Sequence, residues 1–492
     1  MANKEKKKNG FTGHVLNLVS GTVIAQTITL ITAPIICRLF PPEAFGTCSV
    51  FVAITSLLGV IVCLRFDYAV VLPERDEEAI NLMAVSLVAA IVVSGMGGFL
   101  IWMGKAPLVR WLKSPELGPY LWIVPVALLI QGLFQSLNAF NSRRKYFARL
   151  SVARVAASLT TSTVPIGMSA MGQSSPGALI WSWFAGTVVF TLTLGIKIAE
   201  EICEDIRKFV RLDRMLLGVK HYWRFPLIDV WGGFINNLSW LLPTLVFSAF
   251  FSQTIVGYYS LANRVVLMPM ILIGDAIARI FFQRTAELRS KPDDLSKTVQ
   301  RVFRTLSCLG FLPALSLVII GPELFTVVFG ANWIEAGKYA QILGIWMFFL
   351  FIASPMSPLF MVLGRQELSL TIHFSIFITR IIALVSGGLT NNIYLTLWLW
   401  SGTGILVYGG MAFCIMNLAR IPYSFVFQTL LRYLLYSIPI ALALLLAKSL
   451  FKQSPRLILM ASVVPSMVYY FILLSRENRL SAMDFLPWRT SN

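Results

Sequence analysis

Residues 79–103 read AINLMAVSLVAAIVVSGMGGFLIWM, a run of 25 residues without a charged side chain. A transmembrane helix needs about 20 mostly apolar residues to cross the hydrocarbon core of a bilayer. The run is therefore long enough to span a membrane, and the acidic residues Asp76, Glu77 and Glu78 directly before it mark its start. We predict a membrane-spanning helix here, and the same pattern recurs along the chain.

The composition of the whole chain indicates the same class. Of the 492 residues, 57% are hydrophobic and 13% are charged, and the mean hydropathy is +0.74. Soluble proteins carry about 45–50% apolar and about 25% charged residues. The apolar excess argues against a soluble globular enzyme, and it excludes a disordered chain because disorder needs low hydrophobicity.

Apolar segments of spanning length predict an all-α polytopic membrane protein with about fourteen transmembrane helices. The expected spans are 13–37, 45–64, 79–103, 118–139, 150–171, 177–198, 225–250, 254–283, 303–320, 339–363, 367–388, 394–418, 430–449 and 455–475. The span 150–171 has the weakest apolar signal because Ser and Thr residues and Arg154 interrupt it. Four lysines between positions 4 and 8 precede the first span. We interpret that span as an uncleaved helix, since the run is too long for a signal peptide and no A-x-A site follows it.

The basic residues predict the orientation of these spans. Membrane proteins collect Lys and Arg in cytoplasmic loops, which accounts for the net charge of +18 without nucleic acid as a partner. With the N-terminus inside, the inside loops and tails hold 30 Lys and Arg, the outside loops hold 8, and three Arg lie within spans. We therefore expect both termini in the cytoplasm. The polar stretch Lys197–Arg224 is then a cytoplasmic linker, and binding to anionic lipid headgroups is its alternative interpretation.

A weak internal similarity predicts how the spans are grouped. Phe45–Val50 and Val256–Leu261 both carry a Gly three residues before a Ser, at an offset of 211 residues. Six helices separate the two segments, so the halves are expected to be parallel repeats about an axis normal to the membrane, with a substrate site between them. The expected domains are an N-lobe with helices 1–6 and the linker (1–211), a C-lobe with helices 7–12 (212–425), and two extra helices with a cytoplasmic tail (426–492).

Cationic side chains inside the expected spans are candidates for binding a substrate anion. Charges in the membrane are costly, so they face a cavity, a partner or the end of a span. We expect Arg154, Arg264, Arg380 and His373 to line a hydrated cationic cavity, since the planar guanidinium donates two hydrogen bonds to phosphate oxygens. The alternatives are a structural role for each and, for Arg154 near the inner end of its span, snorkelling toward the interface.

Amide side chains repeat at helical spacing in two spans. Gln131, Gln135 and Asn138 follow one another at steps of three or four, which places them on one helix face, and Asn236 and Asn237 lie in a later span. Amides both donate and accept hydrogen bonds, so they are candidate contacts for sugar hydroxyls. Interhelical hydrogen bonding that holds the helix bundle together is the alternative.

Two carboxylates lie well within spans of the second half. Asp229 and Asp275 are candidates for binding a proton or sodium ion whose gradient would be coupled to transport. Their alternative role is to partner a nearby charge, for example Asp275 with Arg279 four residues later.

Motifs of other functional classes are missing from the sequence. The six cysteines form no CxxC or Cys/His cluster, so neither a metal site nor a disulfide framework is expected. No Walker A, H-E-x-x-H or G-x-S-x-G motif occurs. We therefore expect a secondary transporter without a cofactor rather than an enzyme.

Several longer segments resemble a known family. These segments are SGTVIAQ (20–26), APIICRLFPPEAFG (33–46), LRFDYAVVLP (64–73), FGANW (329–333) and EAG (335–337). They are similar to segments of the O-antigen and exopolysaccharide translocases, or Wzx-type flippases, of the multidrug/oligosaccharidyl-lipid/polysaccharide (MOP) exporter superfamily. The similarity extends over essentially the whole chain.

This resemblance implies a fold and a function. The fold would have two six-helix lobes, as in MATE transporters, plus two C-terminal helices. The activity would be alternating-access transport of an undecaprenyl-pyrophosphate-linked oligosaccharide, an O-antigen or exopolysaccharide repeat unit, from the inner to the outer leaflet of the bacterial inner membrane. The polysaccharide polymerase and chain-length machinery would be partners. Two alternatives remain: a cation-coupled multidrug exporter of the same superfamily, or a membrane-embedded polysaccharide glycosyltransferase or ligase.

Overall fold

The computed structural model describes residues 2–451 and 454–476, with side chains for 21–198, 208–451, 454–469 and 471. Every regular element in this part of the chain is helical, which confirms the expectation of an all-α protein. The N-terminal lysines and the acidic linker residues Glu200, Glu201, Glu204 and Asp205 lie outside the described side chains, and the C-terminal tail beyond Arg476 lies outside the described residues.

The chain divides into two units, and the first is Met1–Gly257. Pro42 occupies the first turn of its second helix, where the missing N–H of proline costs no helical hydrogen bond. The helices are α1 (Ala2–Leu39), α2 (Pro42–Gly59), α3 (Phe66–Ala69), α4 (Asp76–Trp111), α5 (Ile123–Arg143), α6 (Phe147–Ala170), α7 (Pro176–Phe209), α8 (Leu212–His221), α9 (Val230–Phe250) and the first turn of α10 (Gln253–Pro269).

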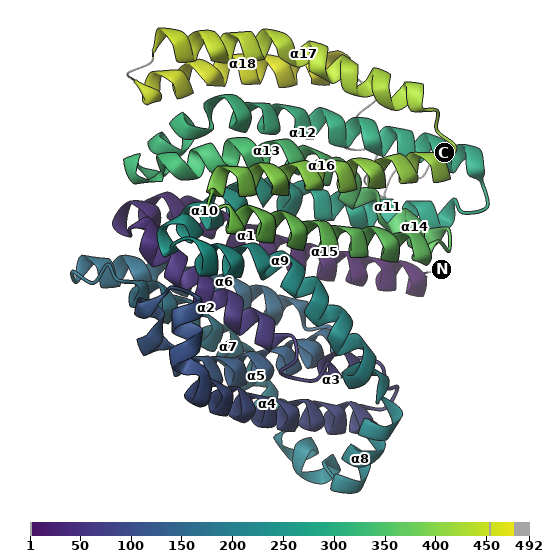
Figure 1. The fold of residues 1–492 in the computed structure, drawn as a ribbon. Coiled ribbons are helices and arrows are strands. Elements are labelled where there is room, and N and C mark those ends of the chain that lie inside the picture. Colours follow the sequence, from purple (N-terminus) through teal and green to yellow (C-terminus); the bar gives the residue numbers. More distant parts are fainter. Residues whose placement is uncertain (1, 452–453, 477–492) are drawn as a thin grey trace. The chain divides into compact units, whose positions relative to one another are not determined.

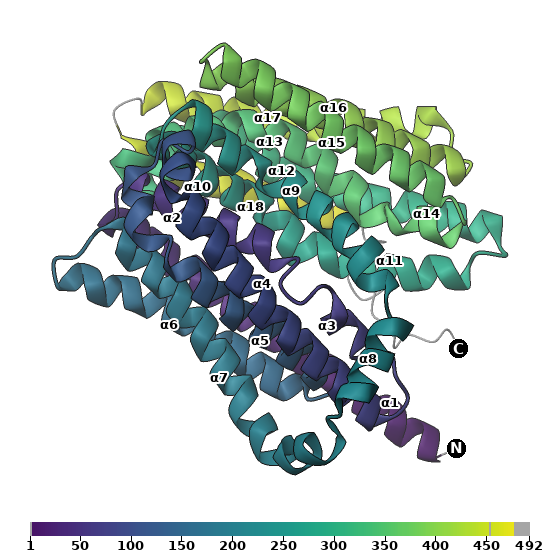
Figure 2. The same ribbon diagram turned by 60° about the horizontal axis from the view of Figure 1, so that its bottom comes forward.

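Within unit 1, many of the helices that pack together are not neighbours in sequence, as α1 and α6 show. Helix α5 packs against α4 and α7, and α2 packs against α5, α7 and α9. The short helix α8 lies beside α4 at one end of the unit (Figure 1, Figure 2). A buried apolar cluster joins α3 to this region: Phe66, Ala69 and Val70 pack with Ile80 of α4 and Phe140 of α5. This cluster anchors the segment that carries the polar residues described below.

The second unit is Tyr258–Asn492. Helix α16 begins with an Asn cap, in which the side chain of Asn392 accepts a hydrogen bond from the backbone N–H of Leu395 at 3.1 Å. The helices are the remainder of α10, α11 (Asp275–Glu287), α12 (Pro292–Phe329), α13 (Ile334–Ala353), α14 (Pro358–Val362), α15 (Gln366–Leu389), α16 (Ile393–Leu418), α17 (Tyr423–Leu450) and α18 (Pro455–Arg476). Helices α17 and α18 lie side by side and cover α12 (Figure 1).

Twelve helices of the described residues are long and apolar enough to cross a membrane, so the protein is a multi-pass membrane protein. Two further expected spans form helices that do not meet the same measure. Helix α6 carries the Ser, Thr and Arg residues that dilute its apolar character, and the described apolar part of α18, Pro455–Tyr469, is short. The count of fourteen spans and the domain limits at 211 and 425 therefore stay predictions.

The expected span 254–283 contains a break that the sequence pattern did not predict. Helix α10 ends at Pro269, a π-helical turn covers Met270–Gly274, and α11 starts at Asp275. A π turn inserts a residue into the helical repeat. Faces before and after it are therefore not in the register of one continuous α-helix.

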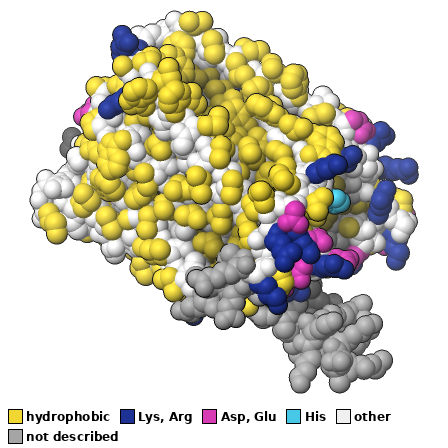
Figure 3. Space-filling view, turned by 90° about the horizontal axis from the view of Figure 1, so that it is seen from below, with side chains coloured by type: hydrophobic (Ala, Val, Ile, Leu, Met, Phe, Trp, Pro, Cys, Tyr) yellow, Lys and Arg dark blue, Asp and Glu magenta, His cyan; other side chains and the backbone are white. Residues whose placement is uncertain are grey.

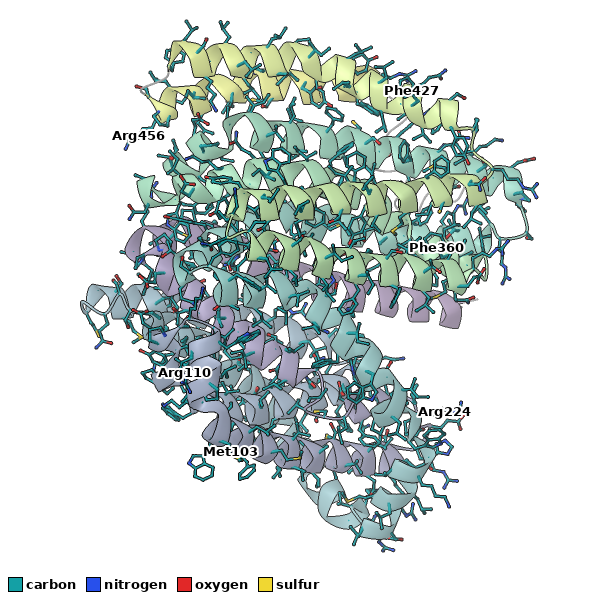
Figure 4. The ribbon with its side chains drawn as sticks, in the orientation of Figure 1. Met103, Arg110, Arg224, Phe360, Phe427 and Arg456 are labelled. Atoms are coloured by element: carbon teal, nitrogen blue, oxygen red, sulfur yellow. The ribbon has the colours of Figure 1, made fainter. Side chains whose placement is uncertain are left out.

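The surface agrees with a membrane protein. Figure 3 shows apolar side chains spread over the visible face, while Lys and Arg gather toward its margin. In unit 1, Arg110 and Arg224 lie at opposite ends (Figure 4). In unit 2, Phe427 and Arg456 lie at opposite ends of the α17–α18 pair (Figure 4). Charged residues at the helix ends and apolar side chains between them are the arrangement that a bilayer requires.

Candidate functional site

Unit 1 contains a polar cavity of about 830 Å³. Its walls come from the end of α2, the segment that contains α3, the middle of α5 and the first turns of α9. We refer to it as the unit 1 cavity. Its lining residues are Ser56, Gly59, Val60, Arg65, Asp67, Tyr68, Val71, Gln131, Phe134, Gln135, Asn138, Ala139, Ser142, Asn236 and Asn237.

The segment after α2 turns sharply and presents its charged residues to this cavity. Leu64 and Arg65 both have left-handed backbone conformations, with φ of 49° and 62°. Residues other than Gly rarely adopt these backbone angles, and the residues that do adopt them concentrate at functional sites. The buried neighbours Phe66 and Ala69 hold the following turn in the apolar cluster of unit 1. The chain therefore tolerates local strain where Arg65 and Asp67 enter the cavity.

Arg65 is held by groups from two elements. Its Nε lies 3.7 Å from Oδ2 of Asp229, in the π turn before α9, and its guanidinium lies 4.8 Å from the centroid of the Tyr68 ring. A β-carbon on Gly233 of α9 would overlap the guanidinium, so only Gly at this position leaves room for it. The ion pair, the cation–π contact and the missing β-carbon together fix where the positive charge lies.

Asp67 is a buried carboxylate beside this arginine. It is 8% exposed, and its Oδ1 has no hydrogen-bond partner within the chain. Burial raises the pKa of Asp67 to about 6, the positive charge of Arg65 opposes this rise, and the negative charge of Asp229 adds to it. The carboxyl group therefore changes its charge close to neutral pH.

The amide residues expected to contact sugars come together in the unit 1 cavity. Gln131, Gln135 and Asn138 line it from α5, and Asn236 and Asn237 line it from α9. Helical periodicity placed the first three on one face, as the spacing predicted. The structure adds that the α9 pair faces the same cavity. Their proposed contact with sugars stays a prediction.

Some of these amides also bind the protein itself. Gln135 donates a hydrogen bond of 2.9 Å from Nε2 to the backbone oxygen of Gly59, and Asn237 donates one of 3.0 Å to the oxygen of Gly233. Gln131 packs against Gly59, where a β-carbon would overlap its amide, and its buried Oε1 has no partner within the chain. The alternative of structural hydrogen bonding therefore applies to Gln135 and Asn237 at least in part.

The expected cations lie elsewhere in the two units. In unit 1, Arg154 of α6 donates a hydrogen bond to Oγ1 of Thr22 on α1 and does not line the cavity. In unit 2, Arg380 of α15 is 5% exposed, lies 4.8 Å from the Trp400 ring and donates a hydrogen bond of 3.4 Å to the Tyr408 hydroxyl. The gap beside Arg380 is about 10 Å³, which is the size of one water molecule.

The other candidates of unit 2 are on exposed helix positions. His373 lies two turns before Arg380 on α15, but it is exposed, and its Nδ1 is 2.6 Å from the backbone oxygen of Ser369. Arg264 and Asp275 are exposed as well. They are eleven positions apart, and the π turn between them breaks the α-helical register of this segment. Among the residues described in unit 2, the structure therefore does not gather these candidates into a described cavity as it gathers the amides of unit 1.

Arg65, Asp67 and Tyr68 are the site residues that sequence reasoning missed. The sequence pattern assigns Arg65 to an inside loop, because the apolar run of the second expected span ends at Leu64. The available signal was the pair of opposite charges in LRFDYAVVLP, enclosed by apolar residues on both sides. Charges in such surroundings need a partner or a cavity. No group of three or more His, Cys, Asp or Glu in the described part of the chain could hold a metal ion.

Comparisons with known proteins add a family and a fold. A family model described as "polysaccharide biosynthesis protein" matches residues 35–338, more than half of the chain. The chain is 22% identical over 382 residues to the lipopolysaccharide biosynthesis protein WzxC of Escherichia coli strain K12, covering 75% of this chain and 73% of that protein. It is 20% identical over 332 residues to the succinoglycan biosynthesis transport protein ExoT of Rhizobium meliloti strain 1021, covering 66% and 65%.

Two solved structures have a similar fold. The lipid II flippase MurJ in an inward closed conformation matches with a TM-score of 0.70 and 12% identity, over 94% of this chain and 99% of that one. A multidrug resistance MATE family transporter of the MOP superfamily, in an inward-facing conformation, matches with a TM-score of 0.63 and 15% identity, over 82% and 99%. At such low identity these matches establish the fold alone.

Proposed function

The chain belongs to the polysaccharide biosynthesis protein family, and from that premise we propose that it flips a lipid-linked oligosaccharide across the membrane. Its relatives are named for polysaccharide biosynthesis and transport, and its structural neighbours include a lipid II flippase and a MATE family transporter of the MOP superfamily. The protein is accordingly a transporter and not an enzyme. The proposed substrate is an undecaprenyl-pyrophosphate-linked O-antigen or exopolysaccharide repeat unit, moved from the inner to the outer leaflet of the bacterial inner membrane.

The observation that carries the proposal is the unit 1 cavity. Five amide side chains, an arginine and a carboxylate line one space of about 830 Å³ in a protein that spans a membrane. Polar groups at membrane depth need a hydrated cavity, and they mark substrate pathways. Amides suit sugar hydroxyls because each can donate and accept.

The finer parts of the proposal concern architecture and topology. We assign fourteen spans to two six-helix lobes with two additional C-terminal helices, and we place both termini in the cytoplasm on the charge bias of the loops. Alternating access would expose the cavity first to the inner and then to the outer leaflet. The polysaccharide polymerase and chain-length machinery would receive the product.

The charged residues have separate roles in the proposal. Arg154, Arg264 and Arg380, with His373, would compensate the diphosphate during its passage. The inside-negative membrane potential favours outward movement of an anion by about 2.3 kcal/mol per charge per 100 mV. Proton or sodium coupling through Asp229 and Asp275 would then serve to reset the carrier.

Deletion of the gene in the native host tests the function. Cells without the protein should accumulate lipid-linked repeat units in the inner leaflet and lose surface polysaccharide. Complementation with Asn138→Leu, which removes an amide from the cavity, should restore less surface polymer than the wild type. Asn417→Leu, on an exposed position of α16, is the matched control and should complement fully. Unchanged surface polymer and no accumulated intermediate in the deletion strain would contradict the proposal.

A second candidate function follows from one observation in the same cavity. The carboxylate of Asp67 could bind a cationic compound, as expected of a cation-coupled multidrug exporter. The deletion strain separates the two functions. Increased sensitivity to cationic drugs with normal surface polysaccharide would favour the exporter, whereas lost surface polymer with unchanged drug sensitivity would favour the flippase.

A further inference from the structure

We infer that the unit 1 cavity holds the sugar part of a lipid-linked saccharide and excludes its diphosphate. This inference rests on the proposed function and deepens it. It divides the substrate between two places: the sugars enter a preformed polar cavity in unit 1, and the charged linkage is bound by other cations of the protein. Three observations carry it, and they concern charge, hydrogen bonding and shape.

The charges around the cavity do not suit a diphosphate. Among the described residues, Arg65 is the one cation that lines it, and the carboxylates of Asp67 and Asp229 lie close to this arginine. Arg143 and Arg144, which follow the lining residue Ser142 in the chain, each form an ion pair of 3.0 Å with Asp76. A diphosphate in the cavity would meet a buried carboxylate without a surplus of positive charge, and like charges at close range repel strongly in a poorly solvated site.

The hydrogen-bonding groups suit hydroxyls. Oδ1 of Asp67 and Oε1 of Gln131 are buried acceptors without a partner in the chain, and Nε of Arg65 has an ion-pair contact but no hydrogen bond. A buried polar atom without a hydrogen bond is costly, so these groups favour a ligand that supplies the missing partners. A sugar hydroxyl donates to a carboxylate or amide oxygen and accepts from a guanidinium. A phosphate oxygen accepts only, and it would leave both acceptors unpaired.

The shape and the aromatic walls agree with a sugar. The volume of about 830 Å³ falls in the range of about 300–1,000 Å³ that is common for sites of small organic ligands. Tyr68 is 56% exposed and lines the cavity together with Phe134 of α5. Aromatic rings offer a flat apolar surface with a polar edge, on which the C–H face of a pyranose can lie. The amides of Asn138 and Asn236 then remain for the hydroxyls at its rim.

A binding experiment with two lipids tests the inference. The full-length protein is placed in lipid nanodiscs, and its affinity is measured for the lipid-linked oligosaccharide extracted from the deletion strain and for undecaprenyl diphosphate without sugar. Wild type, Asp67→Asn and Gln131→Leu are compared. Asp213→Asn, on an exposed position of α8, makes the same charge change away from the cavity and serves as the control.

The sugar-bearing lipid should bind about tenfold more weakly to Asp67→Asn and to Gln131→Leu than to the wild type. Asp67→Asn replaces a charge-assisted hydrogen bond to the ligand by a weaker neutral one, and Gln131→Leu removes a hydrogen bond. The affinity for the bare diphosphate lipid should be unchanged in both variants, and this also shows that they are folded. Equal weakening for the two lipids would place the diphosphate in the cavity of the wild type and overturn the inference. If the wild type binds neither lipid, the proposed function fails and the inference fails with it.

Discussion

Replacing Asp67 by Asn should make the protein more stable at neutral and alkaline pH. The carboxylate is buried beside a single cation and a second carboxylate, and burial raises its pKa from an ordinary value of 3.8 to about 6. Above that pH the folded protein holds a negative charge that would be better solvated in the unfolded chain. Asparagine has nearly the same shape without the charge, so the penalty disappears.

The size of the effect follows from the two pKa values. One pH unit of difference between the folded and unfolded pKa corresponds to about 1.4 kcal/mol. For Asp67, a rise from 3.8 to about 6 therefore limits the gain to about 3 kcal/mol at pH 8. A gain of this size is large for one substitution, because most point mutations destabilise a protein.

The pH dependence has a definite sign. Between pH 3.8 and about 6 the folded protein binds a proton at Asp67 that the unfolded chain has released. The free energy of unfolding of the wild type therefore rises as the pH falls through this window and is flat for this group above it. Asp67→Asn lacks this contribution, so its stability advantage at pH 8 should shrink toward pH 4.

Thermal unfolding in detergent at a series of pH values measures the difference. The midpoint of Asp67→Asn should exceed that of the wild type by a few degrees at pH 8, and the two midpoints should converge toward pH 4. Asp213→Asn, whose carboxylate is exposed, should follow the wild type at every pH. A lower midpoint for Asp67→Asn at pH 8, or a constant difference across the series, would refute the account of a destabilising buried charge.

Four further predictions concern individual positions. Gly233→Ala should lower export severalfold at normal protein level because its β-carbon displaces the Arg65 guanidinium, whereas Gly232→Ala, with open space around it, should export normally. Arg264→Ala should reduce export at normal protein level, since this side chain is exposed. Arg380→Ala should reduce export and also the amount of folded protein, because the Arg380 side chain is buried against Trp400. Blotting of membranes measures the protein level, and a surface-polymer assay measures export. A wild-type protein level in Arg380→Ala would contradict this account. Asp275→Asn should abolish any dependence of transport on pH or sodium, and a dependence that persists in proteoliposomes would remove Asp275 from ion coupling.

The sequence was sufficient to predict the class of protein and the spacing of polar residues along individual helices. Apolar runs of spanning length identify a membrane protein because exposing unpaired polar backbone or side-chain groups to the hydrocarbon core costs free energy. Helical periodicity likewise placed Gln131, Gln135 and Asn138 on one face of α5, since the repeat of the α-helix is a local property. The segments quoted from the two halves carried enough resemblance to indicate the family.

The breaks in the helices were not predictable from the same signals. Hydropathy measures how favourable it is to transfer a segment into lipid. It does not depend on whether the helix contains an α or a π turn. The π turns at Phe225–Asp229 and Met270–Gly274 belong to segments whose mean hydropathy is high enough for a membrane span. The second of these turns separates Arg264 from Asp275, so the two residues do not belong to one continuous α-helix.

The sequence by itself determined that this chain spans a membrane and that its amides form stripes on helices. Only the tertiary structure decided which stripes share a cavity. Asn236 of α9 and Asn138 of α5 are almost a hundred positions apart along the chain, and packing of α2 against both helices brings them to one space. The charges of Arg65 and Asp67 lie in a segment that reads as a short loop, and the left-handed turn at Leu64 and Arg65 directs them inward. Helix periodicity is set by neighbours three or four residues away, whereas a cavity is set by contacts between distant segments, which no local pattern contains.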